Sequence, residues 1–155
     1  MFEVLPVRSE RTEIMKNINN PTNEHIFEEA RIYCLLTNDL TDSWKTVLKW
    51  KGISQAELSR RTGLTRRTIN SYIRGKKNSK LEYVVLMCLA VHLPGEISEI
   101  ILNLSGHSLV LSKRDHIIFN HLLRHKYNES LSEIRDFLLD SGEKIYKIFP
   151  ADSQK

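Results

Sequence analysis

Glycine, proline and cysteine are scarce in this chain: its 155 residues include six, four and two of them. A turn-rich β fold would need more glycine and proline than this. Leucine and isoleucine are frequent, and apolar residues make up 41% of the chain, enough to close a core. The composition therefore predicts an all-α fold, a helical bundle.

Long apolar runs are also missing. No stretch approaches the ~20 apolar residues that a membrane-spanning helix needs. The first ten residues lack the basic-then-apolar pattern of a signal peptide. Cys34 and Cys88 share no motif and each lies in an apolar stretch, so we expect buried free thiols in a reducing compartment. These features together predict a cytoplasmic protein without membrane contact.

Signatures of enzymes and metal sites are absent as well. The chain has no P-loop, no dinucleotide-binding fingerprint and no GxSxG motif. His121 and His125 are four residues apart and His116 lies one turn earlier, but no HExxH pattern or cysteine pair accompanies them. Arg124 and Lys126, on either side of His125, would repel a cation. We therefore expect no enzyme, no metal and no cofactor.

Acidic residues are nearly absent from one window, residues 44–80. This window has eleven Lys and Arg residues and one acid, Glu57, for a net charge of +10. Residues 1–43 carry −4 and residues 81–155 carry −2. A merely solvated helical surface would mix its signs, whereas a basic block between acidic flanks is typical of a polyanion-binding surface. The charge pattern predicts a nucleic-acid contact within this window.

Hydrophobic spacing and capping residues predict eight helices. Residues 1–21 show no period and are interpreted as a tail with a short strand at 2–7. The first helix starts near Thr22 and breaks at residues 38–42, and its buried face is expected to carry Ile26, Ala30 and Tyr33. The second helix is predicted from the i, i+3, i+4 spacing of Trp44, Val47 and Leu48.

The third and fourth helices are short and lie close together in the sequence. Ser54 and Glu57 form a predicted capping box at the start of the third. Gly63 permits the left-handed backbone that its sharp exit needs. Thr65 is expected to cap the fourth helix, which ends before Gly75.

Four more helices are predicted, and their apolar stripes span residues 81–89, 97–104, 117–122 and 134–138. The first of them is expected to end at Pro94 and Gly95. Three capping pairs are predicted here, and they are Ser79 with Glu82, Ser112 with Asp115, and Ser130 with Glu133. Residues 143–155 are interpreted as a short strand or an ordered arm, followed by a polar tail.

Residues 54–76 read SQAELSRRTGLTRRTINSYIRGK. The informative positions are Gln55, Leu58, Ser59, Gly63, Leu64, Thr65, Ile69, Tyr72, Gly75 and Lys76. With these residues at fixed offsets, the segment resembles the helix-turn-helix of the phage-repressor and Xre-like regulator families, over about residues 44–105. Two departures are Ile73, in a slot that is often polar, and a missing proline after Gly75.

Each matching position has a physical role in such a motif. Two short helices that cross closely need a small inward side chain, here Ser59, and a glycine turn, here Gly63. Four apolar residues bury the crossing, namely Leu58, Leu64, Ile69 and Tyr72. This arrangement fixes the second helix on the surface, where it fits a groove about 12 Å wide.

The resemblance also implies the residues that contact DNA. Base edges would be read by Arg66, Arg67, Asn70 and Ser71. Phosphates would be bound by Gln55, Thr65, Arg74, Lys76 and Lys77. Arginine can bond guanine, and asparagine adenine, through two hydrogen bonds each.

The sequence thus predicts a sequence-specific double-stranded DNA-binding protein, most simply a transcriptional regulator. We expect an N-terminal tail and helix (1–42), a helix-turn-helix domain (43–106) and a C-terminal helical extension (107–155). A homodimer is expected, and its candidate surface in the extension consists of Ile117, Ile118, Leu122, Ile134, Phe137 and Leu138. These stripes equally suit an intramolecular core. The alternative function is a partner-binding module, an antitoxin or adaptor, whose DNA binding is secondary.

Overall fold

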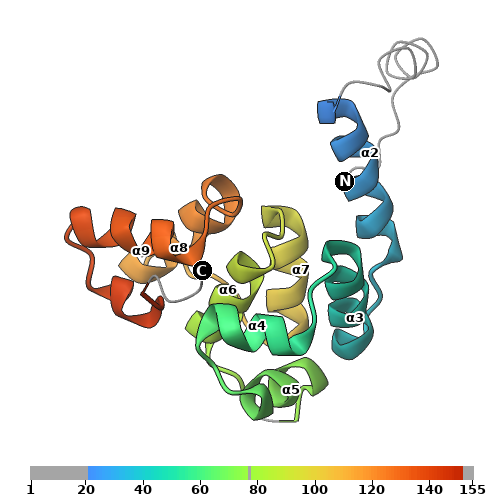
Figure 1. Ribbon diagram of the computed structural model, residues 1–155, viewed down its shortest axis with the longest axis horizontal. Helices are drawn as coiled ribbons and strands as arrows, with labels where there is room; N and C mark the ends of the chain where they lie inside the picture. Colours follow the sequence, from blue (N-terminus) through green and yellow to red (C-terminus); the bar gives the residue numbers. More distant parts are fainter. Residues whose placement is uncertain (1–20, 77, 152–155) are drawn as a thin grey trace. The chain divides into compact units, whose positions relative to one another are not determined.

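The computed structural model describes residues 21–76 and 78–151, and it separates the chain into two compact units, Met1–Leu35 and Leu36–Lys155. The strand expected at residues 2–7 and the side chain of Lys77 lie outside the described residues. Within the described ranges every regular element is helical and none is a strand (Figure 1). The expected all-α fold is thereby confirmed.

In the first unit the structure describes one helix, α2 (Pro21–Leu35). The expected inward face is wrong, because Ile26, Ala30 and Tyr33 are exposed whereas Ile32 is buried. Cys34 is exposed too, contrary to the expectation of a buried thiol. Apolar residues lie all around this helix, so their spacing did not single out one face.

The described residues of the second unit form seven α-helices and one 3-10 helix. In chain order they are α3 (Leu40–Lys51), α4 (Gln55–Thr62), α5 (Arg66–Arg74), α6 (Leu81–Ala90), α7 (Gly95–Leu104), α8 (Arg114–His125), α9 (Leu131–Asp140) and η1 (Lys144–Ile148). The C-terminal segment is thus η1 rather than the expected strand, and Phe149 after it is buried.

Helix α6 is the centre of this unit (Figure 1). All of its residues from Val84 to Ala90 are buried, because α4, α7, α8 and η1 pack around it. A helix that is apolar on every side is stable only when it is enclosed in this way. Because α8 and η1 pack on α6, the C-terminal helices share their core with α3–α7.

Cys88 lies in α6, and burial raises the pKa of its thiol to about 12, which keeps the thiol protonated.

Three helix N-termini differ from the predictions, in their position or in their cap. Helix α3 begins inside the expected break, because the Asp39 carboxylate accepts hydrogen bonds from the backbone of Thr41 and Asp42. Ser79 does not cap α6, since its hydroxyl bonds Nε2 of His107 at 2.9 Å. Helix α8 likewise begins after Lys113 without a side-chain cap, so the predicted role of Ser112 is wrong.

Of two further predictions for helix ends, one is confirmed and one is wrong. Ser130 and Glu133 form the complete reciprocal capping box of α9, with hydrogen bonds of 3.1 and 2.8 Å. Pro94 does not end α6; it precedes α7, and its carbonyl accepts from the backbone of Ser98. The chain leaves α6 at His92, whose φ is +60° and whose Nδ1 lies 2.8 Å from the Tyr127 carbonyl.

Candidate nucleic-acid interface

The turn between α4 and α5 has the geometry that its sequence predicts. Gly63 has a φ of +79°, a left-handed conformation that strains other residues, and its N–H donates to the Ser59 carbonyl. The Ser59 hydroxyl donates to the Leu64 carbonyl at 2.5 Å. The small side chain at 59 thus holds the turn as well as permitting the close crossing.

The crossing of α4 and α5 is closed by buried apolar side chains. Leu58 and Ile69 are fully buried, and Tyr72 is nearly so. The Tyr72 hydroxyl also accepts from the backbone N–H of Lys80 at 3.3 Å, which ties α5 to the loop that follows it. Because α4 itself packs on α6, α5 is fixed to the core of the unit through its inner face.

Both ends of α5 are held by specific hydrogen bonds. The Thr65 hydroxyl accepts from the Thr68 N–H at 3.1 Å, as its predicted capping role requires. At the other end, the Thr41 hydroxyl donates to the Ile73 carbonyl at 2.9 Å. Ile73 is buried where α3 and α5 pack together, which explains an apolar residue in a slot that is often polar.

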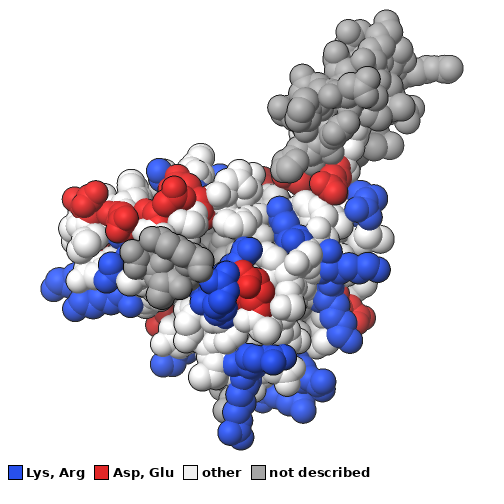
Figure 2. All heavy atoms as spheres, viewed as in Figure 1, with Lys and Arg blue, Asp and Glu red and all other residues white. Residues whose placement is uncertain are grey.

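The outer face of α5 and its flanks carry most of the predicted contact residues. Exposed side chains are those of Thr65, Arg66, Arg67, Asn70, Arg74 and Lys76, whereas Ser71 and Gln55 are half-buried. Nε of Arg74 donates to Oδ1 of Asn70 at 3.3 Å, so these two side chains lie together. Figure 2 shows Lys and Arg gathered at the lower end of the molecule, where Figure 1 places α5.

A second arginine cluster on α4 was not predicted from the sequence. Ser54 caps α4 as expected, but the Glu57 carboxylate bonds Arg60 at 2.5 and 3.0 Å and Arg61 at 2.8 Å. Arg61 also donates to the Ala90 carbonyl at 2.8 Å, joining α4 to the end of α6. These two arginines thus contribute to the packing of the domain, and one carboxylate offsets part of their charge.

The ion pairs of Glu57 with Arg60 and Arg61 should make part of the free energy of unfolding depend on pH. Hydrogen bonds from Arg60 and then Arg61 lower the pKa of Glu57 from 4.5 to about 2. Since the folded-state pKa is below the unfolded one, this stabilisation is present above pH ~4.5 and is lost as pH falls towards ~2. Replacing Glu57 with Gln should lower the denaturant midpoint near neutral pH and flatten its dependence on pH over this range. Parallel pH profiles for the variant and the unmodified chain would contradict the assignment.

Other features of this part of the chain bear on what it can bind. Among the described residues no three His, Cys, Asp or Glu side chains are grouped to hold a metal ion. The described helices include none with the length and apolar character needed to cross a bilayer.

Comparison with known proteins identifies the family of this segment. A helix-turn-helix family model matches residues 45–94, from within α3 through α6 to the segment before α7. No curated protein and no solved structure matches the chain. The match coincides with the packed turn, the capped α5 and the buried crossing described above. Residues 45–94 therefore form a helix-turn-helix similar to that of the Xre and phage-repressor family, which is a DNA-binding family.

Proposed function

We propose that the protein is a sequence-specific transcriptional regulator that places α5 in the major groove of double-stranded DNA. The observation that carries this proposal is the division of α5 into two faces. Ile69 and Tyr72 are packed inward, while Arg66, Arg67 and Asn70 are exposed on a helix whose position is fixed. Such a helix can enter a groove as a rigid unit and present side chains to base edges.

The polar residues around α5 fall into two proposed groups. Base-edge contacts come from Arg66, Arg67, Asn70 and Ser71. Phosphate contacts come from Gln55, Thr65, Arg74, Lys76 and Lys77, which supply affinity and register without sequence information. Gln55 is the first residue of α4, where unpaired backbone N–H groups favour an anion. The 3.3 Å contact between Arg74 and Asn70 allows one phosphate contact to orient a base-reading side chain.

The proposed regulator binds as a homodimer, because one such domain contacts few base pairs. Of the candidate residues in α8 and α9, Leu122, Ile134 and Leu138 are buried in the core of the unit. Ile117 and Phe137 remain 51% and 36% exposed and are the ones available to a second copy. Because the C-terminal helices share the core, deleting them would disrupt the fold, and symmetry is better measured on the full chain.

Selection of bound sites from random double-stranded DNA tests this function. The full chain should enrich a defined motif, arranged as two half-sites about 34–36 Å apart if a symmetric dimer binds. Sedimentation of the complex on the selected site would give its stoichiometry independently. Enrichment of no motif, with only salt-sensitive binding to all sequences, would contradict sequence-specific regulation.

A protein-binding role is the second candidate, and α2 is the observation that favours it. This helix exposes a group of large apolar side chains, Ile26, Phe27, Tyr33 and Leu35. They lie on more than one side of α2, and exposed apolar side chains gathered on one short helix are typical of an interaction surface. An antitoxin or adaptor function would gain support over the first candidate if the selection above returned no motif.

A further inference from the structure

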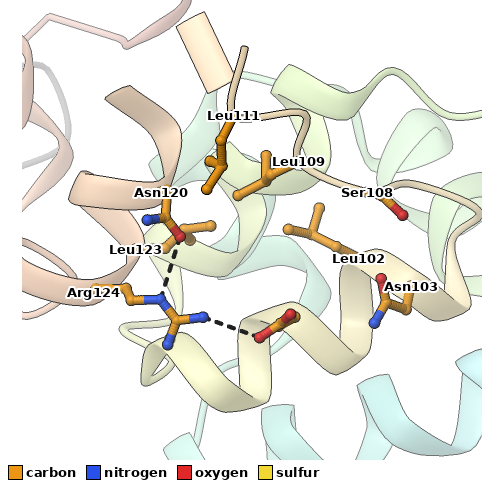
Figure 3. Close-up of a pocket in the computed structure, with 10 residues that line it drawn as sticks. Leu102, Asn103, Ser108, Leu109, Leu111, Asn120, Leu123 and Arg124 are labelled. Carbon is orange, nitrogen blue, oxygen red and sulfur yellow. Dashed lines mark hydrogen bonds and ion pairs between the residues drawn. The ribbon is translucent and has the colours of Figure 1, made fainter. Parts of the chain in front are cut away.

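A cavity of about 510 Å³ lies between α7, α8 and the segment 105–113 that joins them. Figure 3 shows the side chains that surround it. Its volume falls within the roughly 300–1,000 Å³ that is typical of small-molecule sites. No residue of α4 or α5 lines it, so it is separate from the proposed DNA-binding surface.

Four leucines form the apolar part of this cavity. Leu102 and Leu123 come from α7 and α8 and are almost fully buried, whereas Leu109 and Leu111 come from the joining segment. In Figure 3 all four point towards a common space. Leu111 is 59% exposed at its edge. An apolar group bound here would cover the Leu111 side chain, so that the apolar surfaces of the ligand and of Leu111 would both be removed from water.

The charged groups at the cavity are already paired with one another. Nε of Arg124 donates to Oδ1 of Asn120 at 3.2 Å (Figure 3). Nη2 of Arg124 lies 3.0 Å from Oε1 of Glu99, and its Nη1 lies 3.6 Å from Oε2 of Glu96. Gly95 permits this position, since a Cβ there would lie 3.1 Å from Cγ of Arg124. The charged residues that line the cavity, Glu99 and Arg124, are thus paired with each other, and an anionic ligand would meet no net positive charge there.

We propose that this cavity binds a small, uncharged, amphipathic molecule. Its apolar body would lie on the four leucines, and its polar end would bond the Asn103 amide and the Ser108 hydroxyl, which also line the cavity. Paired charges and an apolar floor disfavour ionic ligands, while the amide and hydroxyl groups give an uncharged one an orientation.

Two fluorescent compounds with the same ring system test the proposal on the full chain. N-phenyl-1-naphthylamine is uncharged, and 8-anilino-1-naphthalenesulfonate is its sulfonated counterpart. The uncharged compound should show saturable binding with one site per chain, and the sulfonate should bind at least about fivefold more weakly. Equal or tighter binding of the sulfonate, or no saturable binding of the uncharged compound, would overturn the proposal.

A matched pair of leucine variants locates the site. Leu111→Glu places a charge at the cavity edge, and Leu139→Glu makes the same change on α9, at a leucine that is 46% exposed and outside the cavity. Leu111→Glu should weaken binding of N-phenyl-1-naphthylamine at least about tenfold, while Leu139→Glu should leave it unchanged. Unchanged circular dichroism would show that both variants fold. Equal affinities for the two variants would place the bound compound elsewhere and refute the site.

Discussion

Replacing Arg67 and Asn70 together with alanine should remove most of the preference for the selected DNA site over random DNA. Each two-bond contact with a base discriminates by about 1–3 kcal/mol, so losing two should reduce the specificity ratio by about 30-fold to about 10⁴-fold. Binding to random duplex should fall much less, because phosphate contacts supply most of it. Titration of both duplexes at one fixed salt concentration measures the ratio directly.

Two control variants make this result specific to base reading. Lys76→Ala with Lys77→Ala removes two cations assigned to phosphates, and it should weaken both duplexes alike and flatten the dependence of log affinity on log salt. Lys144→Ala, an exposed cation on η1, should change neither quantity appreciably. If Arg67 and Asn70 behaved like the phosphate pair, with equal losses on both duplexes, they would not be base-reading residues.

The turn and the two faces of α5 were predictable because short-range chemistry determines them. Gly63 can adopt a positive φ, Thr65 can accept from an N–H three residues later, and Ile69 and Tyr72 share one helical face. None of these features depends on distant parts of the chain. The structure agrees with each of them, and the helix boundaries from 55 to 74 are as expected.

Features that depend on long-range contacts were not predictable. Ser79 has the sequence of a helix cap, but His107, 28 residues away, binds its hydroxyl instead. Glu57 is a different case, because its competitors are local: Arg60 and Arg61 follow it by three and four residues on the same helix and bind the carboxylate that a complete capping box would use. The fold was therefore needed to find the partner of Ser79, whereas helical spacing alone could have indicated the partners of Glu57.

Long-range packing also explains why the predicted buried face of α2 was wrong and why Ile73 is buried. Spacing shows that a helix has an apolar face but not whether another element covers it, and α2 carries apolar residues on more than one side. Ile73 looked misplaced because its covering element, α3, lies more than 20 residues earlier in the chain. Burial of a residue is therefore a property of its neighbours in space, which the periodicity of one helix cannot supply.

Ile69→Ala and Asn70→Ala should have opposite effects, although these residues are adjacent on α5. Ile69 is fully buried, so its truncation should lower the free energy of unfolding by about 2–5 kcal/mol. Asn70 is exposed, and its truncation should change that free energy by no more than about 0.5 kcal/mol. The preference for the selected site over random DNA should change in the opposite way. Asn70→Ala should reduce this preference, whereas the folded fraction of Ile69→Ala should retain it. Urea denaturation and competition binding on both variants measure these quantities.

This pair tests whether α5 has the orientation on which DNA reading depends. A helix rotated by about 100°, the angle between successive residues, would exchange the two results, because Asn70 would then turn towards α4. A large stability loss in Asn70→Ala, with full discrimination retained, would therefore reject the assigned faces even if the protein bound DNA by another surface. A stability loss confined to Ile69→Ala, together with lost discrimination in Asn70→Ala, requires α5 to pack on α4 through one face while presenting the other to the DNA.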